Sequence, residues 1–352
     1  MSTTADPEPS SSAVADAADA ALQAARALES TGRVQEALTE CERALRLRPD
    51  PALAQRIVSL RHAAAGTPAG SGLPAWPRQV PDPFPGVAGP PEIEPPQLSA
   101  ATVGGAIRHH GCLIVRGLLA EGRALSLLGM VEHALAARDR AVDGVSEPGD
   151  DDWYRPFEPG RSETRRERHW VRDTGGMLTA DSPVIMCEVL DALADAGALA
   201  AIRGHLGEPA WLSFSKSVLR RVRQTVPTWH QDGAFLGEEV RTVDVWLSLS
   251  HCGPGTGAPG LDLVPRRFDD LLDTQTHGAV FPKSIGQGLV DEAVGDEGWT
   301  SPRFAPGDAI LFDERFVHRS GVGEDFEKDR YAIESWFFAA SHFPGHHLPI
   351  LA

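Results

Sequence analysis

The sequence predicts an α+β protein that is mainly β, with an antiparallel sandwich or jelly-roll core and helices on its flanks. Two observations predict this class. From residue 210 onward, short apolar segments follow one another with turns, not helices, between them. Gly and Pro account for 35 and 28 of the 352 residues, which suits short strands joined by many tight turns. Residues 13–65, by contrast, are rich in Ala and Leu and predict helices.

Charge and cysteine content narrow the function classes. The chain carries 33 basic and 49 acidic residues, and a net charge of −16 repels phosphate backbones, so we expect no nucleic-acid partner. No run of about 18 apolar residues occurs, and the polar, acidic start differs from a signal peptide, so we expect a cytoplasmic protein without membrane association. The four cysteines are scattered, which argues against a thiolate metal site.

The N-terminal part predicts a small separate unit. Residues 1–12 predict a disordered lead, and residues 13–66 predict a helical module that polar breaks at 30–32 and 49–51 divide into three short helices. The spacing of its small residues resembles one tetratricopeptide repeat. Two interpretations stay open: a helical hairpin that caps the main domain, or a module that docks a carrier protein or another protein partner.

Ten prolines between residues 67 and 97 predict a semi-extended linker, because proline lacks the backbone donor that helices and central strands need. The main domain then covers residues 98–352. Its opening predicts a helix, a short strand and two further helices, at 98–110, 111–118, 120–138 and 184–206.

Residues 139–180 predict a polar, irregular segment that would serve as a substrate lid or a solvated surface loop. A basic cluster lies within it, formed by Arg161, Arg165, Arg166, Arg168 and Arg172. Beyond residue 210, strands are predicted at 211–222, 229–236, 241–250, 261–265, 309–313 and 331–339.

A candidate metal site begins with His230 and Asp232. Two residues apart on an extended strand, their side chains would leave the same face and could share one ion. Such a pair alone is a weak signal, because it arises by chance and is common at surfaces. The signal gains strength from His318, which follows the apolar strand at 309–313 and offers a third ligand. Two imidazoles and one carboxylate suit mononuclear non-haem Fe(II), with zinc as the competing metal.

Arg330 stands twelve residues after His318, at the start of the last predicted strand. A guanidinium pairs fork-to-fork with a carboxylate, which is what holding the far end of a dicarboxylate requires. Taken alone, Arg330 could equally form a surface ion pair with Glu327 or Asp329.

Taken together, these residues resemble the phytanoyl-CoA dioxygenase family of Fe(II)/2-oxoglutarate oxygenases. The resemblance runs from about residue 98 to the end and is strongest over 228–339. It implies a double-stranded β-helix, the cupin-like jelly roll. It also implies the following site residues: the metal ligands His230, Asp232 and His318; Arg330 and Ser320 on the 5-carboxylate of 2-oxoglutarate; and Trp246 beside that co-substrate. Arg319 departs from the small residue often found after the distal histidine.

The activity that the resemblance implies is a dioxygenase reaction with Fe(II), 2-oxoglutarate and O2. It would hydroxylate an unactivated C–H bond of a small-molecule substrate and release succinate and CO2. A further co-substrate contact falls among Lys216, Ser217 and Arg220, and His169 and Trp170 are candidates for the substrate pocket. Two alternatives remain: a metal-dependent cupin-type enzyme that does not use 2-oxoglutarate, and a non-catalytic interaction protein built around the N-terminal helices.

Overall fold

The structure is a computed structural model that describes residues 11–66, 76, 78–159, 163–224, 228–237, 239–295, 298–323 and 326–352. Residues 1–10 of the predicted lead lie outside this range, and Ser11 already begins the first helix. The helical module contains α1 (Ser11–Ser30), α2 (Val34–Leu47) and α3 (Pro51–Ala64). Its breaks lie where the sequence predicts them, because Gly32 adopts φ +75° and Asp50 caps α3.

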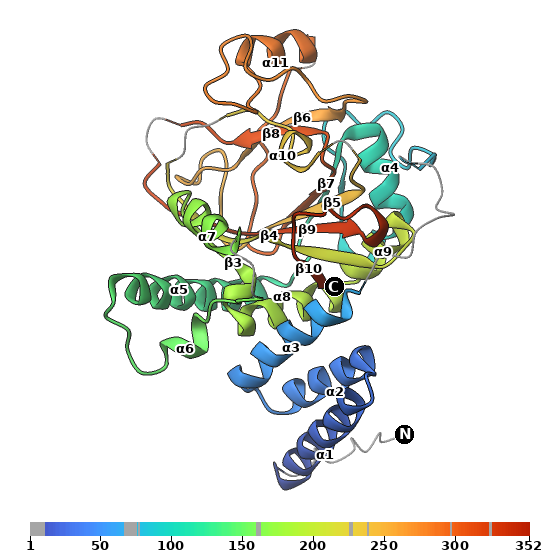
Figure 1. The fold of residues 1–352 in the computed structure, drawn as a ribbon. Coiled ribbons are helices and arrows are strands. Elements are labelled where there is room, and N and C mark those ends of the chain that lie inside the picture. Colours follow the sequence, from blue (N-terminus) through green and yellow to red (C-terminus); the bar gives the residue numbers. More distant parts are fainter. Residues whose placement is uncertain are drawn as a thin grey trace, which may run out of the picture.

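The module contacts the rest of the molecule mainly through α3, and Arg46 of α2 adds an ion pair with Asp191 at 3.1 Å. This helix packs against α8 (Pro183–Asp195) and β10 (Pro349–Leu351), and Arg61 donates to the Leu351 carbonyl at 2.6 Å. Helices α1 and α2 lie farther out, at the end of the molecule opposite β6 and β8, whose bounds are given below (Figure 1). None of the helices in the described ranges is long and apolar enough to cross a membrane.

The described part of the proline-rich segment runs along the main body. His109 Nε2 lies 2.8 Å from the Val80 carbonyl, and His110 Nε2 lies 3.0 Å from a carboxylate oxygen of Asp82. Both histidines end α4 (Ala100–His110). The segment continues into β1 (Glu92–Ile93), which pairs with β2 (Cys112–Val115). Residues 67–75 and 77 of the predicted linker lie outside the described residues.

Residues 139–180 are more regular than the sequence predicts. The elements here are α5 (Glu121–Asp143), α6 (Asp150–Trp153), α7 (Glu163–Asp173) and β3 (Gly176–Leu178), followed by α8 and α9 (Ala198–Leu206). The expectation of an irregular segment is therefore wrong for α7, which is a helix of mostly charged residues. Arg and Glu have high helix propensity, and a search for apolar periodicity overlooks such a helix. Arg161 lies outside the described residues.

The β-rich half forms two sheets. Its strands are β4 (Ala210–Val222), β5 (Thr242–Ser248), β6 (Leu261–Arg267), β7 (Ala309–Phe312), β8 (Phe316–Ser320), β9 (Arg330–Ala339) and β10. The large sheet has the order β1-β2-β7-β5-β9-β4-β10, with β3 beside β4, and β6 pairs antiparallel with β8 in a second sheet. Most predicted strands are confirmed within a few residues. The strand predicted at 229–236 is wrong beyond His230, because the chain turns into α10 (Gly233–Leu236).

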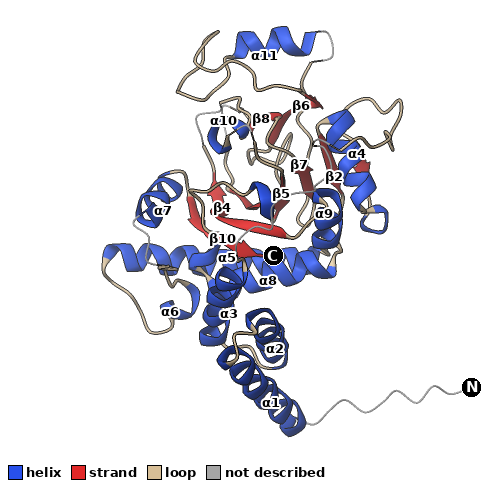
Figure 2. Cartoon of the chain, turned by 45° about the vertical axis from the view of Figure 1, so that its right-hand side comes forward, coloured by secondary structure: helices blue, strands red, loops and turns tan. Residues whose placement is uncertain are grey.

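The large sheet is covered on both faces. Helices α5 and α8 lie beneath it, and the β6–β8 sheet lies above it (Figure 2). Side chains alternate along β9, so Ile333 and Phe337 join the core on the helix side while Trp336 and Phe338 join the core between the sheets. Arg330 is an even number of residues from Trp336, so its side chain leaves the same face of β9, the one that looks toward β8.

Candidate active site

The structure brings His230, Asp232 and His318 together. One ligand atom from each lies within 4.8 Å of those of the other two. The two histidines meet because their backbones form a bridge, in which each N–H donates to the other's carbonyl at 3.0 and 3.1 Å. Asp232 adopts φ −65° and ψ −22°, so it reaches the cluster from the turn into α10 and not from an extended strand. Its Oδ2 lies 3.6 Å from His318 Nε2.

Both imidazoles are oriented by backbone carbonyls. His230 Nδ1 lies 2.8 Å from the Thr228 carbonyl, and His318 Nδ1 lies 3.1 Å from the Phe316 carbonyl. These contacts favour a proton on Nδ1 and leave each Nε2 as the available lone pair. Burial, followed by the proximity of His230, lowers the pKa of His318 to about 4, so this ring is neutral at physiological pH. Two imidazoles and one carboxylate fit a mononuclear Fe(II) ion.

Arg330 is buried, and no carboxylate of the described residues pairs with it. Its side chain donates to the Gly260 carbonyl at 2.9 Å and makes two longer contacts, both 3.4 Å, with Ser320 Oγ. Its guanidinium carbon lies 5.6 Å from the centre of the Trp246 ring. Its Nε has no hydrogen-bond partner within the described chain, and burial lowers its pKa. Because an unpaired buried cation is costly, this environment suits an anionic ligand.

Among the described residues, Arg330 does not form the alternative surface ion pair with Glu327 or Asp329. Arg330 is only 3% exposed, and Asp329 instead pairs with Arg223 at 2.8 Å. His318 and Ser320 are two residues apart on β8 and leave the same face, so the contact with Ser320 places the guanidinium on the same side of β8 as His230, Asp232 and His318. The offset along the strand is about 7 Å.

Arg319 does not enter the site, because alternation along β8 turns it to the opposite face. It forms an ion pair with Asp262 at 2.8 Å and donates to Gln287 at 3.0 Å. Its guanidinium also lies over the rings of Trp229 and Trp299, at 4.3 and 5.2 Å from their centres. Arg319 therefore connects β8 to Trp229, the residue that precedes His230.

Two carboxylates in the same interior, Glu334 and Asp244, were not predicted. Arg220 forks onto Glu334 at 2.6 and 2.9 Å, and its charge and hydrogen bonds hold the pKa of Glu334 below its usual value although burial opposes this. Burial, together with the nearby Asp232 and Glu334, raises the pKa of Asp244 well above its usual range. A charged residue that interrupts an otherwise apolar predicted strand is the signal that could have identified Glu334.

The structure separates the three candidates for a second co-substrate contact. Arg220 is occupied by Glu334, and Ser217 is buried with no hydrogen-bond partner for its Oγ among the described residues. The ammonium of Lys216 lies 5.0 Å from the ring centre of Phe235, which in turn faces His230 at 6.1 Å. Lys216 is therefore the candidate linked to the cluster by contact. Its ammonium also lies 5.8 Å from the Trp170 ring, whereas the side chain of His169 is largely exposed.

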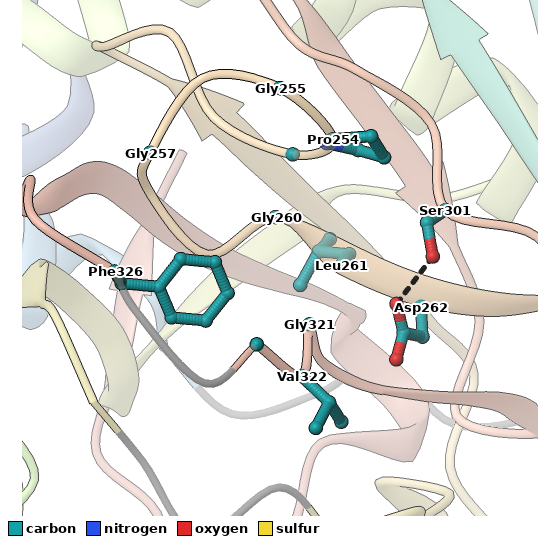
Figure 3. Close-up of a pocket in the computed structure, with 12 residues that line it drawn as sticks. Pro254, Gly255, Gly257, Gly260, Leu261, Asp262, Ser301, Gly321, Val322 and Phe326 are labelled. Carbon is teal, nitrogen blue, oxygen red and sulfur yellow. Dashed lines mark hydrogen bonds between the residues drawn. The ribbon is translucent and has the colours of Figure 1, made fainter.

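A cavity of about 350 Å³ adjoins Arg330 through Gly260 (Figure 3). Its lining consists mostly of glycines and apolar side chains from the loops around residues 253–257 and 321–326. Its polar side chains, Asp262 and Ser301, are hydrogen-bonded to each other at 2.6 Å. The residues that the structure describes in this wall therefore offer no free acid, base or nucleophile, and the ionisable groups gather at the histidine cluster.

No protein-family model matches the chain, and no curated protein matches it. Several solved structures share a low level of similarity. EctD from S. alaskensis with 2-oxoglutarate and 5-hydroxyectoine is 18% identical over 75% of this chain and 88% of that chain, with a TM-score of 0.45. AviO1 from Streptomyces viridochromogenes Tue57 is 17% identical over 70% and 98%, with a TM-score of 0.43.

A third similar structure is SnoK, a non-haem α-ketoglutarate-dependent carbocyclase from nogalamycin biosynthesis. It is 16% identical over 73% of this chain and 91% of that chain, with a TM-score of 0.43. Similarities of this size define neither a family nor a reaction. The assignment of a function to this chain therefore rests on its own residues.

Proposed function

We propose that this chain is a non-haem Fe(II)- and 2-oxoglutarate-dependent oxygenase that hydroxylates an unactivated C–H bond of a small-molecule substrate. One observation carries the proposal. The buried guanidinium of Arg330, which has no carboxylate partner among the described residues, lies beside the same strand face as a cluster of two histidines and one aspartate. The two facing sheets around this cluster support the double-stranded β-helix, and the motifs support a place near the phytanoyl-CoA dioxygenases.

The metal would be held by Nε2 of His230, Nε2 of His318 and a carboxylate oxygen of Asp232. Three ligands on one side leave further coordination positions for 2-oxoglutarate and O2. Bound Fe(II) would supply the activation of O2 and the oxidative decarboxylation of 2-oxoglutarate. One oxygen atom would then enter succinate and the other the hydroxylated product, with CO2 released.

The remaining residues would bind and orient the co-substrate. Arg330 would take the 5-carboxylate of 2-oxoglutarate as a charge-assisted pair, and Ser320 Oγ would donate a hydrogen bond to it. Trp246 would form the apolar wall beside the carbon chain. Phe312 and Phe316, whose ring centres lie 4.7 and 5.9 Å from that of His318, would keep water from the metal's distal ligand.

Ligand binding without turnover tests this function directly. Under anaerobic conditions, Fe(II) plus 2-oxoglutarate should give a weak visible charge-transfer band, and aerobic turnover should form succinate. We expect Arg330→Gln to retain Fe(II) but to need about 100-fold more 2-oxoglutarate for the band. The matched control is Arg223→Gln, which removes a more exposed arginine paired with Asp329 and should titrate like the wild type.

Two results would contradict the proposal. One is the absence of a saturable band in protein that binds Fe(II) stoichiometrically, and the other is an unchanged 2-oxoglutarate titration in Arg330→Gln. Either result would favour a metal-dependent enzyme that does not use 2-oxoglutarate.

A further inference from the structure

Helix α7 presents a basic face to a second cavity, separate from the histidine cluster. Arg165, Arg168, His169 and Arg172 recur at helical spacing and line a cavity of about 270 Å³. The opposite wall comes from the last turns of α5, through Arg138, and from β3. Helix α7 stands beside β3 and near the end of α5 that leads to α6 (Figures 1 and 2).

The cavity is positively charged although the protein is strongly acidic. Four arginines line it against two carboxylates, Glu158 and Asp181, in a chain whose net charge is −16. Such a local concentration of one charge selects ligands of the opposite sign.

Two of the four arginines are committed to the fold. Arg168 forks onto the buried Asp181 at 2.6 and 2.9 Å and also pairs with Glu158. Arg138 bonds to Asp139 and to the Gly176 carbonyl. These pairs fix the walls of the cavity and leave little capacity for a ligand.

The other two arginines remain available. Arg165 has neither an ion pair nor a hydrogen bond within the described chain. Arg172 donates to His169 Nδ1 at 2.9 Å, and its closest carboxylate, Asp173, is 3.9 Å away. Two guanidinium groups with spare donors at one cavity make a site for an oxyanion that can accept several hydrogen bonds.

The remaining wall combines a hydroxyl donor with apolar surface. Tyr154 lines the cavity, and its hydroxyl has no hydrogen-bond partner among the described residues. Burial raises the pKa of Tyr154, so the hydroxyl keeps its proton at neutral pH. Val142 and Met177 add apolar surface beside it. At about 270 Å³ the cavity is near the lower end of small-molecule sites, which leaves room for more than a bare ion.

We propose that this cavity binds the phosphate monoester of a small organic molecule. Arg165 and Arg172 take the dianionic phosphate, the Tyr154 hydroxyl donates a third hydrogen bond, and the organic part lies against Met177 and Val142. The site requires no metal and no 2-oxoglutarate, so it stands independently of the oxygenase function.

The test is isothermal titration of the full-length, metal-free protein with phenyl phosphate and, separately, inorganic phosphate at fixed ionic strength. We expect one site per chain and at least fivefold tighter binding of phenyl phosphate, because only the ester also contacts the apolar wall. The double variant Arg165→Gln/Arg172→Gln should weaken binding at least tenfold. Tyr154→Phe, which keeps the ring, should weaken it about threefold.

The matched control is Arg166→Gln, which removes an exposed arginine of the same helix that does not line the cavity. It should bind phenyl phosphate like the wild type. The proposal is overturned if Arg166→Gln weakens binding as much as the double variant does, because the attraction would then be general. It is also overturned if inorganic phosphate binds as tightly as the ester, or if several ions bind per chain.

Discussion

Two buried arginines on neighbouring stretches of the chain have opposite environments. Arg319 on β8 is 9% exposed and meets a carboxylate, an amide and two indole rings. Arg330 on β9 is 3% exposed and meets a backbone carbonyl, a hydroxyl and one indole. Burial therefore does not distinguish a binding arginine from a structural one. The distinction lies in whether the fold itself supplies the counter-charge.

The largest expected effect tests whether Arg330 lies beside a metal at all. Asp232→Ala removes the charged member of the ligand cluster, so we expect loss of Fe(II) binding and a fall in turnover on the order of 1000-fold. Iron content after gel filtration and succinate formation measure the two effects. Asp270→Ala, which removes a fully exposed carboxylate, should retain iron and activity. Retention of stoichiometric iron by Asp232→Ala would show that the three residues do not form the metal site.

The next effect concerns the structural arginine. Arg319→Met keeps much of the side-chain volume but leaves Asp262 buried without its cation, so we expect the free energy of unfolding to fall by about 3 kcal/mol. Urea denaturation monitored by tryptophan fluorescence measures this change. The fraction that stays folded should bind 2-oxoglutarate normally. A normal stability together with lost 2-oxoglutarate binding would reverse the roles assigned to the two arginines.

Arg330→Met should give the converse result. Because no carboxylate of the described residues pairs with this buried cation, its removal should leave the free energy of unfolding of the ligand-free protein unchanged or raised. The KM for 2-oxoglutarate should rise about 100-fold, because the far carboxylate loses its charge-assisted partner. Parallel denaturation and steady-state kinetics give both values. A marked loss of stability with an unaltered KM would mean that Arg330 is a structural residue.

The smallest effect is expected at Ser320. Both of its contacts with Arg330 are long, at 3.4 Å, so Ser320→Ala should raise the KM for 2-oxoglutarate only about threefold and leave stability unchanged. Initial-rate kinetics at saturating substrate will measure it. An effect as large as that of Arg330→Met would show that the hydroxyl, and not the guanidinium, carries most of the carboxylate binding.

Short-range patterns predicted much of this arrangement. Motif spacing predicts His230, Asp232, His318 and Arg330, and the family resemblance implies Ser320 and Trp246. The structure places these residues around one interior. Their roles toward iron and 2-oxoglutarate, the family, the tetratricopeptide-like repeat and the domain boundaries stay predictions. The extended strand expected at 230–232 is wrong for Asp232, which reaches the cluster from the turn before α10.

Other features depend on information that local patterns lack. Arg220 and Glu334 are 114 residues apart, and they meet only because β4 lies next to β9 in the sheet order. Helix α7 has no apolar stripe to reveal it, and its basic face became a cavity wall only where α5 supplied Arg138. The Arg220–Glu334 ion pair and the cavity beside α7 thus depend on contacts between distant segments, which local sequence patterns do not predict.

Three consecutive residues of β8 have different roles because their side chains leave the strand on alternate faces. His318 and Ser320 turn inward, and Arg319 between them turns outward to Asp262. A slip of one residue in the pairing of β8 with β6 would turn both inward side chains away at once and point an arginine at His230 and Asp232. Insertions within this strand should therefore be fatal to activity, while changes of length in the loop that begins at Gly321 should be tolerated.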